Sequence, residues 1–476
     1  MIFNIQKMCN IQKLKCINFI RFLCKFNKVV QLFLNLDSIL SNKEYKSIMV
    51  MKVRYFLLLQ FFLSVVLWSS CSKVEAPEAP VIEEKEKTIL IYMSANNNLY
   101  MDAANNISKI INGYIPEDEN LLIYSIPLDL ETKAILDTLP VLMQVKYDEG
   151  HNVVVDTLYK FPYQNSSTKT ALSRALNITK TLCPAKEYGL VLWSHGTGWL
   201  PPLYTTSGGS SSSEVNMIMN EKRRIDPYAH LVKSFGNELD TEMSIFDLQT
   251  AIPTDMYFDF IAFDACLMGG VEILYELRNN CNYMIFSPAE ILTDSFDYST
   301  VVEDFFKADY AKAAYDIYNY YNNLSGIYRS VTIATFKTDG VELLAEKAAE
   351  IFNLYRDQIQ SLDLDNIQPY YRYNAHWYYD LNDFIKNLAP ASQASEFEII
   401  LNSLCVAKYT TGQLLDLDID PLKFSGISCY INSPTNTELD TYYKKYGWEK
   451  VVNMTLATGG DDDDSDDDSG DSGDGD

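Results

Sequence analysis

Short, continuous apolar runs alternate with stretches of helical pattern from Thr88 onward, and this alternation most restricts the fold. A continuous apolar run indicates a strand buried on both faces, and a helix between two such runs supplies the crossover of a parallel sheet. The predicted fold class is therefore α/β, with helices on both faces of a mostly parallel central sheet. Strands are expected at 88–93, 121–126, 189–193, 258–263 and 283–287, and helices at 99–111, 167–182, 244–252 and 269–278.

The remaining segments contain further strands. Residues 141–147 and 153–159 are predicted to pair as a hairpin across an Asp-Glu-Gly turn, and later strands are expected at 330–336 and 426–431. Beyond residue 301 the chain is more helical and rich in tyrosine, of which it has 33. Because the tyrosines follow no regular spacing, we interpret them as core and surface residues and not as a stacking platform for sugars or bases.

A secretory signal is predicted at residues 51–70. Lys52 and Arg54 precede an apolar run over 55–68, two small residues follow, and Cys71 comes directly after them. This order is similar to a bacterial lipoprotein signal, in which the mature chain begins at a lipid-modified cysteine. We expect an exported lipoprotein, anchored to the membrane through Cys71. An uncleaved membrane anchor is the alternative, but a run of about 14 apolar residues falls short of the roughly 20 that span a bilayer.

The sequence predicts one large folded body with segments of other kinds before and after it. Residues 1–50 lie upstream of a complete signal and are interpreted as a mis-set start, and 71–87 as an extended Pro/Glu tether. Residues 88–300 form the predicted core, and 301–456 a helix-rich portion that completes the fold. Residues 457–476 are expected to be an acidic, disordered tail.

The charge excludes one class of partner. The formal net charge is −25 for the whole chain and −33 from Cys71 onward, because the upstream residues are basic. Nucleic-acid backbones are bound by clustered Lys and Arg, so no nucleic-acid partner is expected. The same acidity would attract basic peptides.

The cysteine count points to one thiol with a special role. Of nine cysteines, three lie in 1–50 and one is Cys71, which leaves five in the body. An odd number in an exported chain indicates one free thiol or one with a chemical role. With Cys266 set aside, four cysteines remain in the body: Cys183, Cys281, Cys405 and Cys429. They allow three disulfide pairings, and the sequence does not choose among them.

Two reactive residues follow two of the predicted strands. His195 comes just after 189–193 and is followed by glycines, and Cys266 comes just after 258–263 and before a predicted helix. Ligands of open α/β sheets lie at the carboxyl ends of the strands. A thiol at a helix N-terminus is biased toward the thiolate, and a nearby imidazole strengthens this bias. Either residue alone would be an ordinary core residue, but the pair indicates nucleophilic acyl transfer.

The sequence around these residues matches a known pattern. It reads Ser-His-Gly-Thr-Gly-Trp at His195 and Asp-Ala-Cys-Leu-Met-Gly at Cys266, with further matching blocks at 234–236, 243–248, 271–277, 287–290 and 378–384. Together these blocks resemble the clostripain family of cysteine peptidases. The resemblance covers roughly 88–431 and implies a caspase-like α/β/α sandwich.

The resemblance also implies a role for each matching residue. His195 would act as general base and acid, and Cys266 as the thiolate nucleophile. Backbone N–H groups of Gly196 and Cys266 would form the oxyanion hole. Asp264 would line the pocket for the residue before the scissile bond, where a carboxylate selects Arg or Lys. The family needs no third residue to orient the histidine.

Two positions depart from the family pattern. Asn96 stands where the family usually has Asp, and 295–298 replaces the usual Gly, aromatic, Pro, Tyr block. In the resembled family the loop at 295–298 helps to shape the substrate pocket. The preference for Arg or Lys therefore depends on the residues that this chain has there. Asp294 and Asp297 would supply a second pocket carboxylate or be solvated.

A basic run interrupts the acidic body. Lys222, Arg223 and Arg224 follow a Ser-rich loop between the His195 and Cys266 blocks. Some members of the resembled family are cut in this region, so self-cleavage after one of these residues is a hypothesis. A surface charge cluster is the alternative.

No cofactor is expected from the sequence. No Cys/His cluster has zinc spacing, and no Gly-rich phosphate loop follows a strand. Calcium dependence is kept open because it occurs in the resembled family. The predicted function is an exported, lipid-anchored cysteine endopeptidase that cuts protein or peptide substrates, with a preference for Arg or Lys. The alternative is a non-catalytic surface-binding lipoprotein on the same fold.

Overall fold

The structure, a computed structural model, describes residues 82–202, 227–228, 241–373, 377–432 and 437–455, together with Met51 and Tyr55. Several predicted features lie outside these residues: the signal, the lipidation site Cys71, the basic run Lys222 to Arg224 and the acidic tail. No helix within the described ranges is long and apolar enough to cross a membrane.

Parallel strands make up the centre of the sheet. Strand β1 pairs in parallel with β2 on one side and with β5 on the other, and β5, β6 and β7 continue the parallel pairing. The burial of these strands is almost continuous along their length, as expected for a sheet covered on both faces. Their bounds are β1 (Lys85–Met93), β2 (Asn120–Ser125), β5 (Ala185–Trp193), β6 (Phe258–Asp264) and β7 (Cys281–Phe286).

Antiparallel strands flank the centre on both sides. The described residues form a nine-stranded sheet in the order β10-β8-β7-β6-β5-β1-β2-β3-β4, in which β2–β3, β3–β4, β7–β8 and β8–β10 are antiparallel pairs. The flanking strands are β3 (Val141–Tyr147), β4 (Val153–Lys160), β8 (Thr332–Lys337) and β10 (Cys405–Thr410). The predicted hairpin of β3 and β4 is therefore confirmed.

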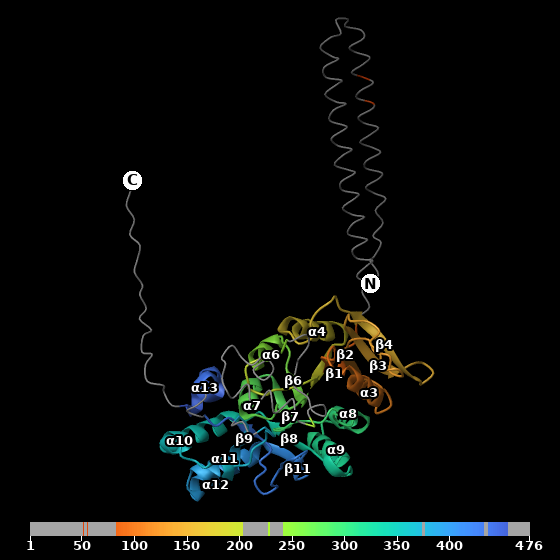
Figure 1. Cartoon of the computed structure of the whole chain (residues 1–476). Coiled ribbons are helices and arrows are strands. Elements are labelled where there is room, and N and C mark those ends of the chain that lie inside the picture. Colours follow the sequence, from red (N-terminus) through yellow and green to blue (C-terminus); the bar gives the residue numbers. More distant parts are fainter. Residues whose placement is uncertain are drawn as a thin grey trace, which may run out of the picture. The chain divides into compact units, whose positions relative to one another are not determined.

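Helices cover the two faces in two groups (Figure 1). One group contains α3 (Tyr100–Ile111), α8 (Tyr298–Phe306) and α9 (Tyr310–Asn322). The other contains α4 (Lys169–Leu182), α6 (Ile245–Ala251), α7 (Val271–Leu277), α10 (Val341–Ile359), α11 (Leu381–Leu388), α12 (Ala391–Leu404), α13 (Thr437–Tyr443) and α14 (Gly447–Val452). Short 3-10 turns lie at Gly326–Tyr328 and Leu364–Asn366. This arrangement is the predicted α/β/α sandwich.

Helix starts follow the capping residues in the sequence. The Ser244 hydroxyl accepts a hydrogen bond from Asp247 N–H at 3.0 Å and begins α6, as predicted. The Thr168 hydroxyl accepts from Ala171 N–H at 3.3 Å at the start of α4. Each side chain satisfies an N–H group that would otherwise lack an intrahelical partner.

The expected strand at 426–431 is wrong in its extent. Only β13 (Ser428–Cys429) is extended there, and it pairs with β9 (Tyr379–Asp380) in a separate two-stranded sheet. A second small sheet joins β11 (Gln413–Leu414) and β12 (Leu417–Asp418). The apolar run at 426–431 arises because these residues are buried against the core. Strand β10, which the sequence did not reveal, is a half-exposed edge strand and lacks a continuous apolar run.

None of the three disulfide pairings is formed. Among the described residues all five cysteines are free thiols. Burial raises the pKa of Cys183 and of Cys405 to about 11, and it raises the pKa of Cys281 and Cys429 well above the usual range. These four thiols therefore stay protonated at neutral pH, because burial disfavours the charged thiolate.

A buried glutamate joins the C-terminal portion to the core. Glu272, in the first turn of α7, is fully buried, and its Oε1 accepts hydrogen bonds from Tyr430 N–H and the Tyr443 hydroxyl, both at 2.8 Å. Its Oε2 has no hydrogen-bond partner among the described residues. Burial raises the pKa of Glu272 to about 7.

We expect Glu272→Gln to stabilise the protein at alkaline pH. A carboxyl whose pKa is raised in the folded state weakens folding as the pH rises from the unfolded pKa toward about 7 and beyond. The variant should gain about 3 kcal/mol in the free energy of unfolding at pH 8 and nothing near pH 4.5. Urea unfolding at both pH values measures this. A variant that is less stable than the wild type at pH 8 would contradict it.

Candidate active site

The parallel pairing brings the two predicted catalytic residues to one edge of the sheet. Trp193 at the end of β5 lies opposite Asp264 at the end of β6. His195 and Cys266 each follow two residues later, so they leave the sheet side by side. Met93 of β1 lies opposite Trp193, which places the segment after β1 at the same edge.

Glycines bring the histidine loop into contact with the cysteine loop. A Cβ at Gly196 would collide with the Cys266 carbonyl oxygen and lie 3.1 Å from the Ala265 Cβ. Gly198 has a φ of 65°, and a Cβ there would lie 2.5 Å from the Leu267 carbonyl oxygen. A side chain at either position would clash with the facing backbone, and the left-handed conformation at Gly198 is one that glycine adopts without strain. The predicted closeness of the His195 and Cys266 loops is therefore built into the backbone.

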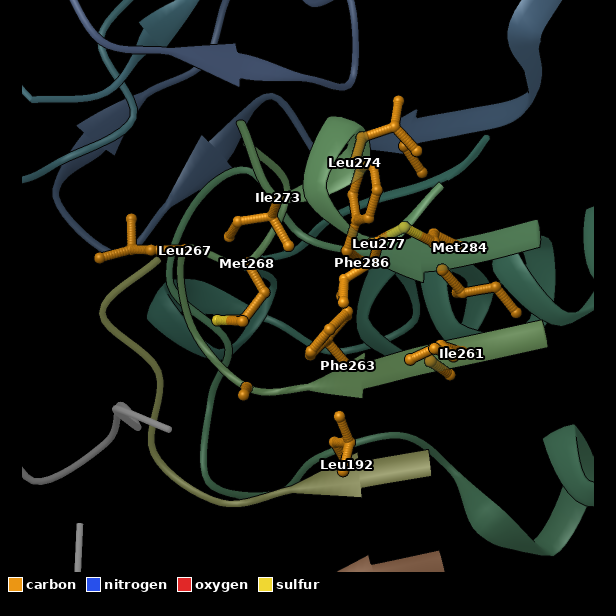
Figure 2. Packing of buried hydrophobic residues seen from close by; sticks show 14 of the residues in the cluster. Leu192, Ile261, Phe263, Leu267, Met268, Ile273, Leu274, Leu277, Met284 and Phe286 are labelled. Atoms are coloured by element: carbon orange, nitrogen blue, oxygen red, sulfur yellow. The ribbon is translucent and has the colours of Figure 1, made fainter. Parts of the chain in front are cut away.

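The Cys266 sulfur contacts the backbone of one residue. Ile291 N–H donates to Sγ at 3.1 Å, and the thiol donates to the Ile291 carbonyl oxygen at 3.4 Å. Cys266 is 1% exposed. The loop turns sharply at Leu267, whose φ is 62°. Figure 2 shows that Met268 points into the apolar layer between β6 and α7, whereas Leu267 projects away from it.

A residue that the sequence analysis did not single out contacts the histidine. The Oδ1 atom of Asn98 lies 2.7 Å from Nε2 of His195. An amide oxygen only accepts hydrogen bonds, so Nε2 carries the proton and Nδ1 is the basic nitrogen. The sequence feature that could have indicated this contact is a run of three asparagines, Asn96 to Asn98, which comes shortly after the first strand.

Distant segments brace the histidine loop. The Thr197 hydroxyl donates to Glu242, and the Tyr378 hydroxyl donates to the Thr197 carbonyl oxygen. Trp199 Nε1 donates to the Trp377 carbonyl oxygen at 3.0 Å. Residues beyond 301 therefore help to fix the loop that carries His195.

The comparisons with known proteins agree with this geometry. The model of the clostripain family matches residues 91–216 and 232–453, which is most of the chain. The chain belongs to the clostripain family. It is a cysteine peptidase with the caspase-like fold of that family. A search of the curated proteins finds no match.

Solved structures of clostripain-family proteins share the fold. An inactive zymogen C11 protease from Parabacteroides distasonis is 28% identical, with a TM-score of 0.63 over 78% of this chain and 99% of that chain. A secreted C11 cysteine protease from Bacteroides thetaiotaomicron, iotapain, is 21% identical, with a TM-score of 0.63 over 78% of this chain and all of that one. A C11 protease from the same organism in complex with an irreversible peptide inhibitor is 23% identical, with a TM-score of 0.62 over 78% of this chain and all of that one.

The predicted pocket residue of this clostripain-family chain is a fully buried carboxylate. Asp264 Oδ2 accepts hydrogen bonds from the Tyr298 hydroxyl at 2.8 Å and from Phe296 N–H at 3.4 Å. Burial and the Asp264 carboxylate raise the pKa of Tyr298, so its phenol stays protonated and donates. Both donors come from the loop whose sequence departs from the family pattern.

Ser295, at the position of the usual family glycine, has a left-handed backbone conformation. Its φ is 66°, in the left-handed region that favours glycine. Its buried hydroxyl accepts from Trp193 Nε1 at 3.0 Å and from Asn106 Nδ2 at 3.1 Å. These hydrogen bonds offset the strain, which costs roughly 1 kcal/mol.

The two other acidic residues of the loop have partners at the surface. Asp294 forms an ion pair with Lys109 at 3.0 Å and accepts a hydrogen bond from the Tyr320 hydroxyl. Asp297 accepts from the Ser299 hydroxyl at 2.7 Å at the start of α8. A pocket role for Asp294 stays a prediction. No group of three or more His, Cys, Asp or Glu side chains in the described ranges is placed to hold a metal ion.

We expect Asn98 to support the charged form of His195. An imidazolium donates a stronger hydrogen bond than a neutral imidazole, so removing the acceptor should lower the pKa of His195. Asn98→Ala should reduce kcat/KM about 10-fold and move the alkaline limb of its pH profile down, whereas Asn98→Asp should move that limb up.

The matched control is Asn112→Ala, which removes an exposed amide hydrogen bond of similar length, 2.9 Å, at the end of α3. Equal alkaline limbs in wild type, Asn98→Ala and Asn98→Asp would show that Asn98 does not act on the histidine.

Proposed function

We propose that this chain is an exported, lipid-anchored cysteine endopeptidase that forms an acyl-enzyme on Cys266 with His195 as its acid–base partner. The observation that carries this proposal is the packing of Gly196 on the Cys266 carbonyl oxygen at the shared edge of β5 and β6. It brings a histidine and a cysteine from segments 71 residues apart to one place. Such a pair at strand ends suits acyl transfer.

Each step of the reaction follows from a group in the site. Nδ1 of His195 takes the thiol proton, and the Cys266 thiolate attacks the peptide carbonyl carbon. Backbone N–H groups of Gly196 and Cys266 stabilise the oxyanion. The C–N bond then breaks, and the amine leaves with the proton from Nδ1. Water, deprotonated by the same nitrogen, hydrolyses the thioester and restores the thiol.

The substrate preference proposed is Arg or Lys before the scissile bond. Asp264 is a buried side chain whose two donors, the Tyr298 hydroxyl and Phe296 N–H, are neutral, and a carboxylate at this position selects a cationic side chain. The charge of −33 from Cys71 onward favours the approach of basic peptides. The peptide-inhibitor complex of a protein with the same fold supports peptide binding in this site.

The cellular setting is proposed from the sequence. The signal and Cys71 support export and lipid anchoring, and one protein with the same fold is described as secreted. Self-cleavage after Lys222, Arg223 or Arg224 is proposed from the basic run in the sequence, with Cys266→Ala as the uncut reference on a gel. Calcium dependence is also a proposal, tested by activity with and without a chelator.

Fluorogenic peptides with Arg, Lys or a neutral residue before the reporter test the activity and the pocket together. We expect turnover of the Arg and Lys peptides, none with Cys266→Ala, and a fall of about 100-fold in kcat/KM for them with Asp264→Asn. The Asn amide still accepts from Tyr298, so the pocket keeps its shape and loses its charge.

Each other outcome has a defined meaning. Turnover of neutral peptides alone would overturn the basic pocket and keep the enzyme. No turnover of any peptide, with no covalent adduct at Cys266, would favour a non-catalytic binding protein on this fold.

A further inference from the structure

A ladder of hydrogen bonds connects the cysteine loop to the segment after β7. Gly269 N–H donates to the Ser287 carbonyl oxygen and Leu267 N–H donates to the Ala289 carbonyl oxygen, both at 2.8 Å. The next contact along the same two segments is Ile291 N–H to Cys266 Sγ at 3.1 Å. The sulfur therefore occupies the last rung of the ladder, and its position depends on Ile291.

Glu290, between the last two rungs, is held by a buried ion pair. Arg372 Nε lies 2.5 Å from Glu290 Oε2, and the side chains are 2% and 5% exposed. Arg372 also contacts Asp416 Oδ1 at 3.2 Å and the Tyr373 hydroxyl at 3.3 Å. One arginine from the C-terminal portion thus connects the segment beside the nucleophile to the loop between β11 and β12.

We propose that Arg372 is a positioning residue, which holds Ile291 N–H on the Cys266 sulfur through its ion pair with Glu290. The proposal rests on the proposed function, in which Cys266 is the nucleophile. Replacing either partner weakens this buried ion pair, because Lys does not reproduce the guanidinium geometry and Gln carries no charge, and the segment is then free to move. That movement would take Ile291 N–H away from Sγ.

The consequence for the thiol has a defined direction. An N–H donor stabilises a thiolate, so its loss makes the thiolate harder to form. Among the described residues, the titratable and charged groups on the segments around this loop include His195, Glu242, Asp264, Glu272, Glu290, Tyr298, Arg372 and Tyr378. Asp264 and His195 are unchanged in the variants below, so a shift reports the ladder.

Site-resolved alkylation of Cys266 by iodoacetamide, followed by peptide mass spectrometry across pH 5 to 10, tests the proposal. Arg372→Lys and Glu290→Gln should each move the midpoint pH of Cys266 alkylation upward by about one unit and lower kcat/KM about 10-fold. Arg372→Lys keeps a buried positive charge and is the milder change should Glu290→Gln fail to fold. Arg278→Lys is the matched control, because Arg278 pairs with Glu342 at 2.5 Å on the surface of α7.

The result decides in either direction. Midpoints that move upward in the two variants and not in Arg278→Lys support the proposal. Midpoints that move downward in the two variants, or a Cys266 that reacts in the two variants alone, overturn it. The same Cys266 behaviour in all four proteins, whether reactive or unreactive, overturns it. Alkylation needs no peptide turnover, so a wild type that is labelled but cuts no peptide would overturn the proposed function and leave this test valid.

Discussion

The close contact of Gly196 with the Cys266 backbone is the constraint on which the site depends. Parallel register places both loops at one edge of the sheet, but register alone leaves the loops free to diverge. The missing Cβ at Gly196 lets the two backbones touch. The loops that carry the imidazole and the thiol are then held together by main-chain packing, which is stiffer than any contact between two exposed side chains.

The C-terminal portion supports the candidate site and is not an appendage. Tyr378 and Trp377 hold the histidine loop, while Arg372 reaches the segment beside Cys266. Glu272 joins the helix after Cys266 to Tyr430 and Tyr443. The sheet itself continues into β8 and β10, which come from the same portion. A chain ending near residue 300 would lack each of these supports.

The sequence contained most of the central sheet and the two catalytic candidates. Continuous apolar runs are sufficient for buried parallel strands, and a reactive residue directly after such a run lies at the ligand-binding edge. The roles of Asn98 and Arg372 were not predicted. Their partners lie 97 and 82 residues away in the sequence, and polar contacts between distant segments leave no periodic pattern. Strand β10 was not predicted because it lies at the edge of the sheet. An edge strand is half exposed and needs no continuous apolar run, so the pattern that marks a buried strand is missing. The cysteine count alone does not reveal which cysteines the fold brings close enough to pair, and in the structure all five described cysteines are free.

Covalent labelling of a Gly196→Ala variant tests the assembly of the site most directly. The intact mass is measured after exposure to a lysyl peptide acyloxymethyl ketone, with Gly150→Ala as control, because a Cβ there meets only the Asp148 and Asn152 side chains. We predict one adduct per chain, on Cys266, for wild type and Gly150→Ala, and labelling at least about 10-fold slower for Gly196→Ala. Equal labelling of folded Gly196→Ala and wild type would contradict the claim that this contact assembles the site.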